Sequence, residues 1–189
     1  MISEQRKKIH PHKFALWIAI GSIIMMFAAF TSAYIVKKGQ SNWLSFELPA
    51  IFWYSTCVIL ISSITMHFAL KSFRNRAMQQ YKMLITITVL LGLAFVTLQW
   101  LGFITLQQKG ILLLGNNSNA SASFLGVISG MHIVHVLGGV IALMIILFKS
   151  YSNGTKNYNN VVPIEIVNTY WHFVDLLWIY LFIFFKMIG

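Results

Sequence analysis

Four ionisable side chains that could do chemistry lie within two strongly apolar stretches of the sequence. His132 and His135 are three residues apart, and His172 and Asp175 are again three residues apart. Residues at this spacing share one face of a helix, so each pair presents its two side chains together. An ionisable side chain inside a membrane is costly and needs a partner. These four residues are therefore the first candidates for a functional site.

Three kinds of site fit these residue types. They can form a hydrogen-bonded cluster that fixes how two helices pack, with Asp175 paired to His132, His135 or His172, because an unpaired buried carboxylate is costly. Histidines on facing helices can also provide both axial ligands of a haem. Histidine and aspartate at membrane depth can pass protons along a relay. We favour the structural cluster, because the second well-matched histidine pair that a haem site needs is missing.

The surroundings of these residues also favour a packing role. Trp171 and Trp178 are seven residues apart, close to two helical turns, and so share a face. Gly126 and Gly130 form a small-xxx-small pair, which lets helices approach closely. Glu165 opens the last apolar stretch, where a carboxylate complements the helix dipole. The predicted structural polar cluster comprises His132, His135, Trp171, His172 and Asp175.

The elements that hold these residues are membrane-spanning helices. The chain is 58% hydrophobic and only 10% charged, whereas soluble domains carry about 25% charged residues. A bilayer core of about 30 Å needs roughly 20 apolar residues in a helix. Five stretches are long enough: about Phe14 to Val36, Leu48 to Leu70, Met83 to Leu106, Ser121 to Phe148 and Glu165 to Met187. The sequence therefore predicts an all-α polytopic membrane protein, since β-barrel strands would alternate over about ten residues.

The distribution of basic residues predicts the orientation of the bundle. Ten of the fourteen Lys and Arg residues lie in the N-terminal tail and in the second and fourth connections, and cytoplasmic loops carry such an excess. We expect residues 1–13 to form a basic cytoplasmic tail and residues 14–189 a five-helix domain with a periplasmic C-terminus. His67, near the cytoplasmic end of the second stretch, is expected to be an interfacial imidazole rather than a ligand. The net charge of +10 sits in short clusters beside apolar runs, which suits anionic lipid and not nucleic acid.

The string YWHFVDLLW, Tyr170 to Trp178, resembles the last helix of subunit III of haem-copper respiratory oxidases, the cytochrome c and quinol oxidases. The remaining matches are SGMHIVHVLGG (129–139), LPAIFWYSTCVILISSITMHFA (48–69, with Ser55 where the family usually has Asn), LGLAFVTLQ (91–99) and Glu165, which stands five residues before Tyr170. The resemblance runs from about Phe14 to the C-terminus. Five spans fit the shorter bacterial form of the family, which lacks the first two helices of the seven-helix form.

Two positions depart from the family pattern. Ile23 stands where the family has a membrane-embedded glutamate, and Gly102 replaces a second carboxylate. Whatever these carboxylates do in relatives, including any part in proton supply, therefore does not carry over to this chain.

The resemblance implies an accessory membrane subunit without a metal or haem of its own. It would pack against the catalytic subunit I, with subunit II also in the complex, in a proton-pumping terminal oxidase of the bacterial inner (cytoplasmic) membrane. Haem and copper would belong to the catalytic partner, and the subunit would stabilise that partner and bind phospholipid. Two alternatives are a haem-bearing membrane cytochrome and a small proton-conducting or transport protein, although the absence of an internal repeat does not favour a transporter.

Overall fold

The computed structural model describes residues 11–39, 43, 48–111, 119–152 and 161–188. Its elements are five helices: α1 Pro11–Lys38, α2 Ile51–Arg74, α3 Met78–Gln108, α4 Ala120–Ser152 and α5 Val162–Ile188. Each helix is long and apolar enough to cross a membrane. The predicted all-α fold with five membrane-spanning helices is therefore confirmed.

The helices extend beyond the apolar stretches that predicted them. The helix α3 begins at Met78, five residues before the predicted start at Met83, and α5 begins at Val162, three residues before Glu165. Helical hydrogen bonding continues through polar residues at the ends, whereas an apolar run stops where the polar residues begin. Pro11 opens α1, a position where proline's missing N–H costs nothing, and residues 1–10 of the predicted tail lie outside the described residues.

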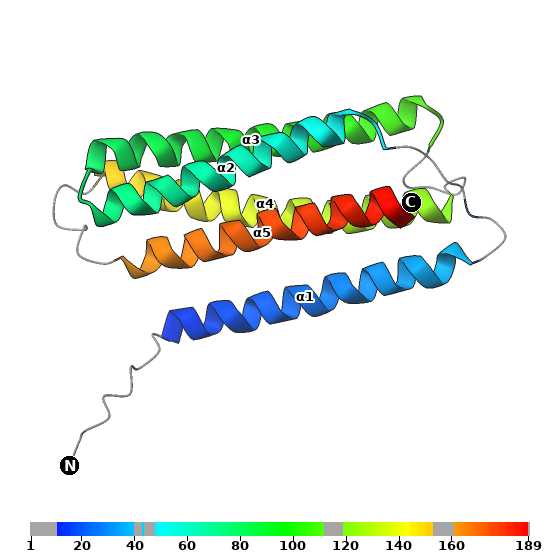
Figure 1. Ribbon diagram of the computed structural model, residues 1–189, viewed down its shortest axis with the longest axis horizontal. Coiled ribbons are helices and arrows are strands. Elements are labelled where there is room, and N and C mark those ends of the chain that lie inside the picture. Colours follow the sequence, from blue (N-terminus) through cyan, green and yellow to red (C-terminus); the bar gives the residue numbers. More distant parts are fainter. Residues whose placement is uncertain (1–10, 40–42, 44–47, 112–118, 153–160, 189) are drawn as a thin grey trace, which may run out of the picture.

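The bundle is organised around α5. The helices α2 and α3 form a hairpin, α4 lies along α3 and α5, and α1 packs against α4 and α5 on the opposite side from the hairpin (Figure 1). Half of the residues in the apolar stretch of α5 that could cross a membrane are buried, compared with 17% of those in the corresponding stretch of α1. The helix α5 is thus the central element and α1 a peripheral one.

A short turn joins α2 to α3. The backbone N–H of Asn75 donates to the Lys71 carbonyl, and that of Ala77 donates to the Ser72 carbonyl, both at 3.0 Å. These bonds satisfy carbonyl groups that the end of α2 would otherwise leave unpaired. Arg76 takes a left-handed backbone conformation with φ of 58°, which closes the turn.

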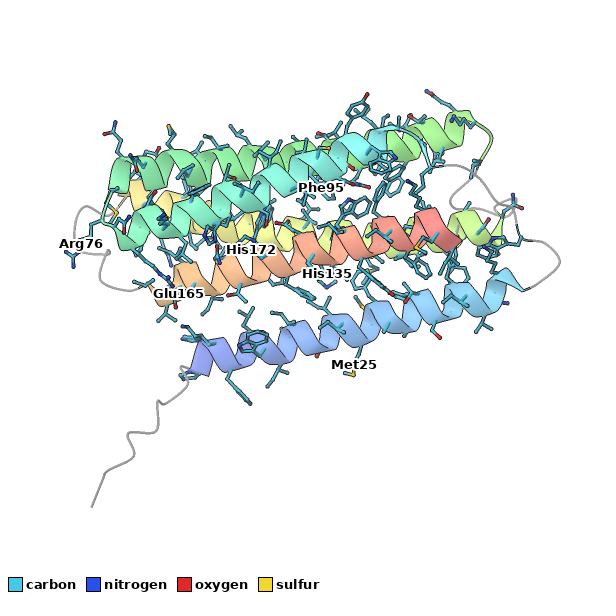
Figure 2. All side chains as sticks on the ribbon, viewed as in Figure 1. Met25, Arg76, Phe95, His135, Glu165 and His172 are labelled. Atoms are coloured by element: carbon cyan, nitrogen blue, oxygen red, sulfur yellow. The ribbon has the colours of Figure 1, made fainter. Side chains whose placement is uncertain are left out.

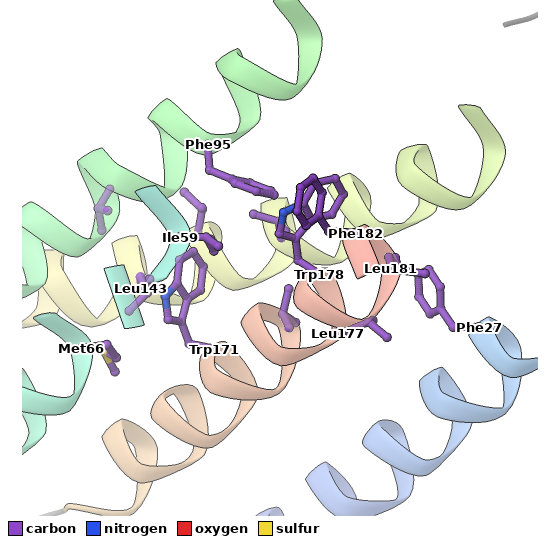
Figure 3. Close-up of a cluster of buried hydrophobic side chains, with 14 of the residues drawn as sticks. Phe27, Ile59, Met66, Phe95, Leu143, Trp171, Leu177, Trp178, Leu181 and Phe182 are labelled. Carbon is purple, nitrogen blue, oxygen red and sulfur yellow. The ribbon is translucent and has the colours of Figure 1, made fainter. Parts of the chain in front are cut away.

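The core is built on two tryptophans of α5. Trp171 and Trp178, two turns apart on α5, both point into the bundle, with Phe95 of α3 above Trp178 and Phe27 of α1 near Leu181 (Figure 3). Trp171 is fully buried and Trp178 is 1% exposed. The prediction that the two indoles share one face of the last helix is confirmed.

Candidate functional site at the seam between α2 and α5

Trp171 touches three other helices at once. Its indole lies between Gly92 of α3 and Gly139 of α4: a Cβ atom added at these glycines would come within 2.8 Å of Cη2 and 2.9 Å of Cε3, respectively. Its Nε1 donates a hydrogen bond to Ser62 Oγ of α2 at 3.1 Å. Only residues without a side chain leave enough room for the ring here, so Trp171 fixes the distances between α2, α3, α4 and α5.

Trp178 repeats this arrangement two turns further along α5. Its Nε1 donates to Thr56 Oγ1 of α2 at 3.0 Å. Its ring stacks on that of His132, with centroids 5.2 Å apart and planes 28° apart. Both indole N–H groups are thus paired with hydroxyls of α2, as buried tryptophans usually require.

His132 is enclosed by aromatic rings. The ring is fully buried and lies against Phe27, Phe95 and Trp178, with the first two centroids 6.4 and 6.0 Å away. Neither ring nitrogen has a hydrogen-bond partner within the described part of the chain. His132 therefore does not pair with Asp175, and a haem could approach it only by displacing packed core residues.

His135 faces its own helix. Its Nδ1 donates to the Met131 carbonyl at 2.7 Å, and its backbone carbonyl accepts a hydrogen bond from the Tyr170 hydroxyl at 3.1 Å. Its ring also meets the Phe27 ring edge-on, with centroids 5.8 Å apart. His135 connects α4 to α5 through backbone and ring contacts rather than through a carboxylate.

His172 of α5 faces α2, and Asp175 lies three residues further along α5. The His172 Nδ1 is 2.6 Å from Ser63 Oγ, and its ring centroid is 6.4 Å from that of His67. Asp175 is 3% exposed. Neither of its carboxyl oxygens has a hydrogen-bond partner among the described residues. The expectation that Asp175 pairs with His132, His135 or His172 is therefore wrong. The two histidines of α4 make other contacts, and the Nδ1 of His172 lies against Ser63.

Sequence reasoning missed the hydroxyl groups of α2. Besides Thr56, Ser62 and Ser63, Ser55 Oγ accepts a hydrogen bond from Gln99 Nε2 at 2.9 Å. Two adjacent pairs, Ser55 with Thr56 and Ser62 with Ser63, are seven residues apart and thus share a face, as the two tryptophans of α5 do. This matching spacing was the signal that could have found them.

Glu165 does more than complement a helix dipole. Its Oε2 lies 2.6 Å from Lys13 Nζ of α1, and its Oε1 lies 2.7 Å from an Arg74 guanidinium nitrogen of α2. Figure 2 shows Glu165 at the start of α5, at the end of the bundle where α2 also ends. One carboxylate therefore ties three helices together at this end.

The two positions at which we expect this chain to have lost a carboxylate are occupied by apolar packing. Ile23 is partly buried against the core. The Cβ position of Gly102 would lie 3.0 Å from Phe52 Cζ, so the Phe52 ring fills the space where a longer side chain would stand.

Two further features bear on ligands. Among the described residues, no three His, Cys, Asp or Glu side chains come together as they would around a metal ion.

A groove of about 890 Å³ lies between α1, α4 and α5, near the end that carries Glu165. Its lining is mainly apolar and includes Ile145, Ile146 and Ile166, together with His12 and Lys149.

Comparisons with known proteins agree with this architecture. The family model for Cytochrome c oxidase subunit III matches residues 12–189. Cytochrome c oxidase subunit 3 of Bacillus sp. (strain PS3) is 26% identical over 171 residues, which cover 88% of this chain and 80% of that protein. Cytochrome bo(3) ubiquinol oxidase subunit 3 of Pseudomonas aeruginosa is 28% identical over 174 residues, 89% of this chain and 81% of that protein.

A third relative is similar over a longer part of both chains. The probable quinol oxidase subunit 3 of Staphylococcus saprophyticus is 29% identical over 185 residues, 94% of this chain and 89% of that protein. The family match covers nearly the whole sequence and all five helices. The chain therefore belongs to the cytochrome c oxidase subunit III family of the haem-copper oxidases, as a multi-pass membrane subunit of an oxidase complex.

Proposed function

We propose that this chain is an accessory subunit, without a cofactor of its own, that stabilises the catalytic subunit of a proton-pumping haem-copper terminal oxidase. The observation that carries the proposal is the family match over residues 12–189. The reaction, reduction of oxygen to water with electrons from cytochrome c or quinol, belongs to the complex. Haem and copper are held by the partner.

The packing of the candidate residues supports an accessory role. Trp171 and Trp178 are committed to contacts between helices, and His132 is enclosed by aromatic rings. A haem-bearing cytochrome would need a histidine nitrogen aimed at open space, and the His132 ring has Phe27, Phe95 and Trp178 against it instead. This arrangement favours the accessory subunit over a cytochrome.

The partners proposed are oxidase subunit I, oxidase subunit II and membrane lipid. Large apolar side chains are exposed along the outer faces of the helices, as on α1 with Trp17 and Met25 and on α4 with Val134 and Phe148. Such faces suit contact with lipid tails or with apolar helices of other subunits. The groove between α1, α4 and α5 suits a phospholipid, with its acyl chains on the apolar walls and an anionic headgroup near Lys149.

We place the protein in the bacterial cytoplasmic membrane with its N-terminus in the cytoplasm. Lys13, Arg74 and Lys149 lie near the same end of the bundle, at the start of α1 and the ends of α2 and α4. An excess of basic residues at one end marks the cytoplasmic side.

Copurification tests the proposal directly. The full chain, tagged at its N-terminus and isolated in mild detergent from its native membrane, is expected to bring with it a large subunit that contains haem and copper. The reduced-minus-oxidised haem spectrum should disappear when that large subunit is removed. Isolation of the chain alone with a haem spectrum of its own, or alone and active in transport after reconstitution, would contradict the accessory role.

A further inference from the structure

Three buried side chains of α3 and α4 keep polar atoms that helix packing does not explain. Gln99 and His132 are fully buried, and Ser129 is 1% exposed. No hydrogen-bond partner among the described residues exists for Gln99 Oε1, Ser129 Oγ or either ring nitrogen of His132. Such atoms cost free energy, and lipid tails offer them no donor or acceptor. We propose that the three side chains form a binding site for trapped water between α3 and α4, a property beyond the accessory role proposed above.

One ring contact fixes the register of the two helices. His132 of α4 lies against Phe95 of α3, with ring centroids 6.0 Å apart. Gln99 is one turn beyond Phe95 along α3, and Ser129 is about one turn before His132 along α4. Because α3 and α4 run in opposite directions (Figure 1), both steps lead toward the same end of the bundle. This register places Gln99 opposite Ser129, beside the His132 ring.

A second contact between the same helices gives a closely similar register. A Cβ atom at Gly92 of α3 would lie 3.0 Å from Val140 Cγ2 of α4. Gln99 is seven residues beyond Gly92, and His132 is eight residues before Val140. Both intervals are about two helical turns, so this contact places Gln99 level with His132. The two contacts together place Gln99 within the turn of α4 that carries Ser129 and His132.

The Gln99 amide is held from the other side, by α2. Its Nε2 donates to Ser55 Oγ at 2.9 Å, and the Ser55 hydroxyl donates to the Phe52 carbonyl at 2.9 Å. The only hydrogen of the Ser55 hydroxyl is thus used within α2, and Ser55 cannot donate to Gln99 Oε1. Since α3 packs against α2 and α4, a donor for Gln99 Oε1 has to come from the side of α4.

The rings around His132 cannot satisfy its nitrogens. Phe27 and Phe95 meet the imidazole edge-on, with planes 74° and 86° from its own, and the Trp178 ring stacks on it. A phenyl ring has no conventional donor or acceptor, and the Trp178 N–H is already donated to Thr56 Oγ1. These neighbours exclude lipid from His132 without replacing the hydrogen bonds that its nitrogens need.

The chemistry of the unpaired atoms suits water. Gln99 Oε1 only accepts hydrogen bonds, the Ser129 hydroxyl donates and accepts, and an uncharged imidazole has one donor and one acceptor. A buried water usually makes about three hydrogen bonds to polar groups that otherwise have none. A metal cation fits less well, because none of these three side chains is a carboxylate and an uncompensated charge at this depth is costly.

Contact with bound water can be measured directly by NMR. The full chain, with ¹⁵N-labelled glutamine, would be placed in nanodiscs of deuterated phosphatidylcholine. We expect nuclear Overhauser transfer from water to the Gln99 side-chain amide protons, which are identified by the loss of their signal in Gln99→Met. The sign of the transfer in the rotating frame distinguishes a bound water from exchange of the amide protons.

A double-mutant cycle tests whether Gln99 and Ser129 share the water. Gln99→Met and Ser129→Ala should each raise the equilibrium constant for unfolding roughly tenfold, because each leaves the atoms at the other end of the water less well paired. Together they should raise it much less than the roughly hundredfold that independent losses would give, since the second change acts on a water already lost.

Thr88→Val provides the matched control for this cycle. Thr88 is a fully buried residue of the same helix, but its Oγ1 already bonds Thr65 Oγ1 and the Leu84 carbonyl. Because Thr88 is three turns from Gln99, its loss and that of Ser129 should add fully.

Two results would overturn the proposal. One is the lack of any transfer from bound water to the Gln99 amide in the unmodified chain, even if Gln99 and Ser129 are coupled, because a direct bond between them would then explain the coupling. The other is full additivity of the Gln99 and Ser129 losses, as for Thr88 and Ser129. These measurements use the isolated full chain, so they stand whether or not the chain copurifies with an oxidase.

Discussion

At the scale of single residues, two adjacent glycines have opposite surroundings. A Cβ atom at Gly139 would lie 2.9 Å from Trp171 Cε3, whereas one at Gly138 meets only the Tyr170 hydroxyl, at 3.8 Å. Because Trp171 is fully buried, its ring has little space into which it can move. These two positions therefore form a matched pair for measuring how tightly the indole is held.

Gly139→Ala should lower the free energy of unfolding by about 1–3 kcal/mol, the usual cost of inserting a methyl group into a packed core. Gly138→Ala should change it by less than about 0.5 kcal/mol. Unfolding by denaturing detergent, followed by tryptophan fluorescence in lipid micelles, would measure both values. Equal losses in the two variants would show that the contact with Trp171 does not limit side-chain size.

Gly102 and Phe52 should depend on one another. Gly102→Ala brings a Cβ atom within about 3.0 Å of the Phe52 ring and should cost about 1–3 kcal/mol. In a Phe52→Leu background the same change should cost less, which gives an interaction energy of about 0.5–3 kcal/mol in a double-mutant cycle. Additive losses would contradict the view that the Phe52 ring fills the space beside Gly102.

Residue spacing predicted faces but not partners. The seven-residue interval between Trp171 and Trp178 correctly placed both indoles on one buried face. The same kind of reasoning wrongly gave Asp175 a histidine partner, because a shared face on one helix does not say which neighbour that face meets. It also missed Ser62 and Ser63, since single hydroxyl groups are common in membrane helices and become informative only when an indole or imidazole lies opposite.

At the scale of elements, α1 is a peripheral helix with contacts near both ends. Lys13 pairs with Glu165 of α5 at its start, and Lys38 donates to the Ile188 carbonyl at its end. Between these, Thr31 Oγ1 accepts a hydrogen bond from the Tyr180 hydroxyl at 3.2 Å. Because few residues of α1 are buried, these polar contacts should limit how often the helix opens locally.

Lys13→Gln should raise amide hydrogen exchange in the first turns of α1 and leave the exchange of α2 unchanged. Arg74→Gln removes the other partner of Glu165 and should not affect α1, which makes it the control. Both cations are substantially exposed, so global stability should fall by less than about 1 kcal/mol in either variant. Faster exchange in α1 for both variants would indicate that Glu165 acts as one unit with its two cations.

The apolar character and length of five stretches were sufficient to predict all five helices, because roughly 20 apolar residues have few alternatives to a membrane-spanning helix. The ends were less accurate, as the early start of α3 at Met78 shows. The order of packing, with α5 central and α1 peripheral, could not be read from hydropathy, since the peripheral α1 is as apolar as α3. It depends on which faces carry glycines and tryptophans that fit each other.

At the scale of the whole molecule, the basic residues predict one orientation across the membrane. The turn at Asn75 lies between α2 and α3, and the turn at Lys109 follows α3 at the opposite end of that helix. In a Cys57→Ser background, Lys109→Cys should react with a membrane-impermeant maleimide in spheroplasts with an intact membrane. Asn75→Cys should react only after the membrane is opened. The reverse pattern would place the N-terminus outside the cytoplasm.

The space between α2, α3 and α4 that holds the Trp171 indole also has a consequence for biosynthesis. Its walls are Gly92, Gly139 and Ser62, which are translated before the indole that fills them. While the ribosome is still producing α5, the first four helices can insert in the membrane but lack the ring that sets their spacing. A nascent chain that stalls before Trp171 should therefore be a loose, protease-sensitive assembly of helices. When the ribosome completes and releases α5, Trp171 would convert this loose assembly into a tight bundle in a single late step.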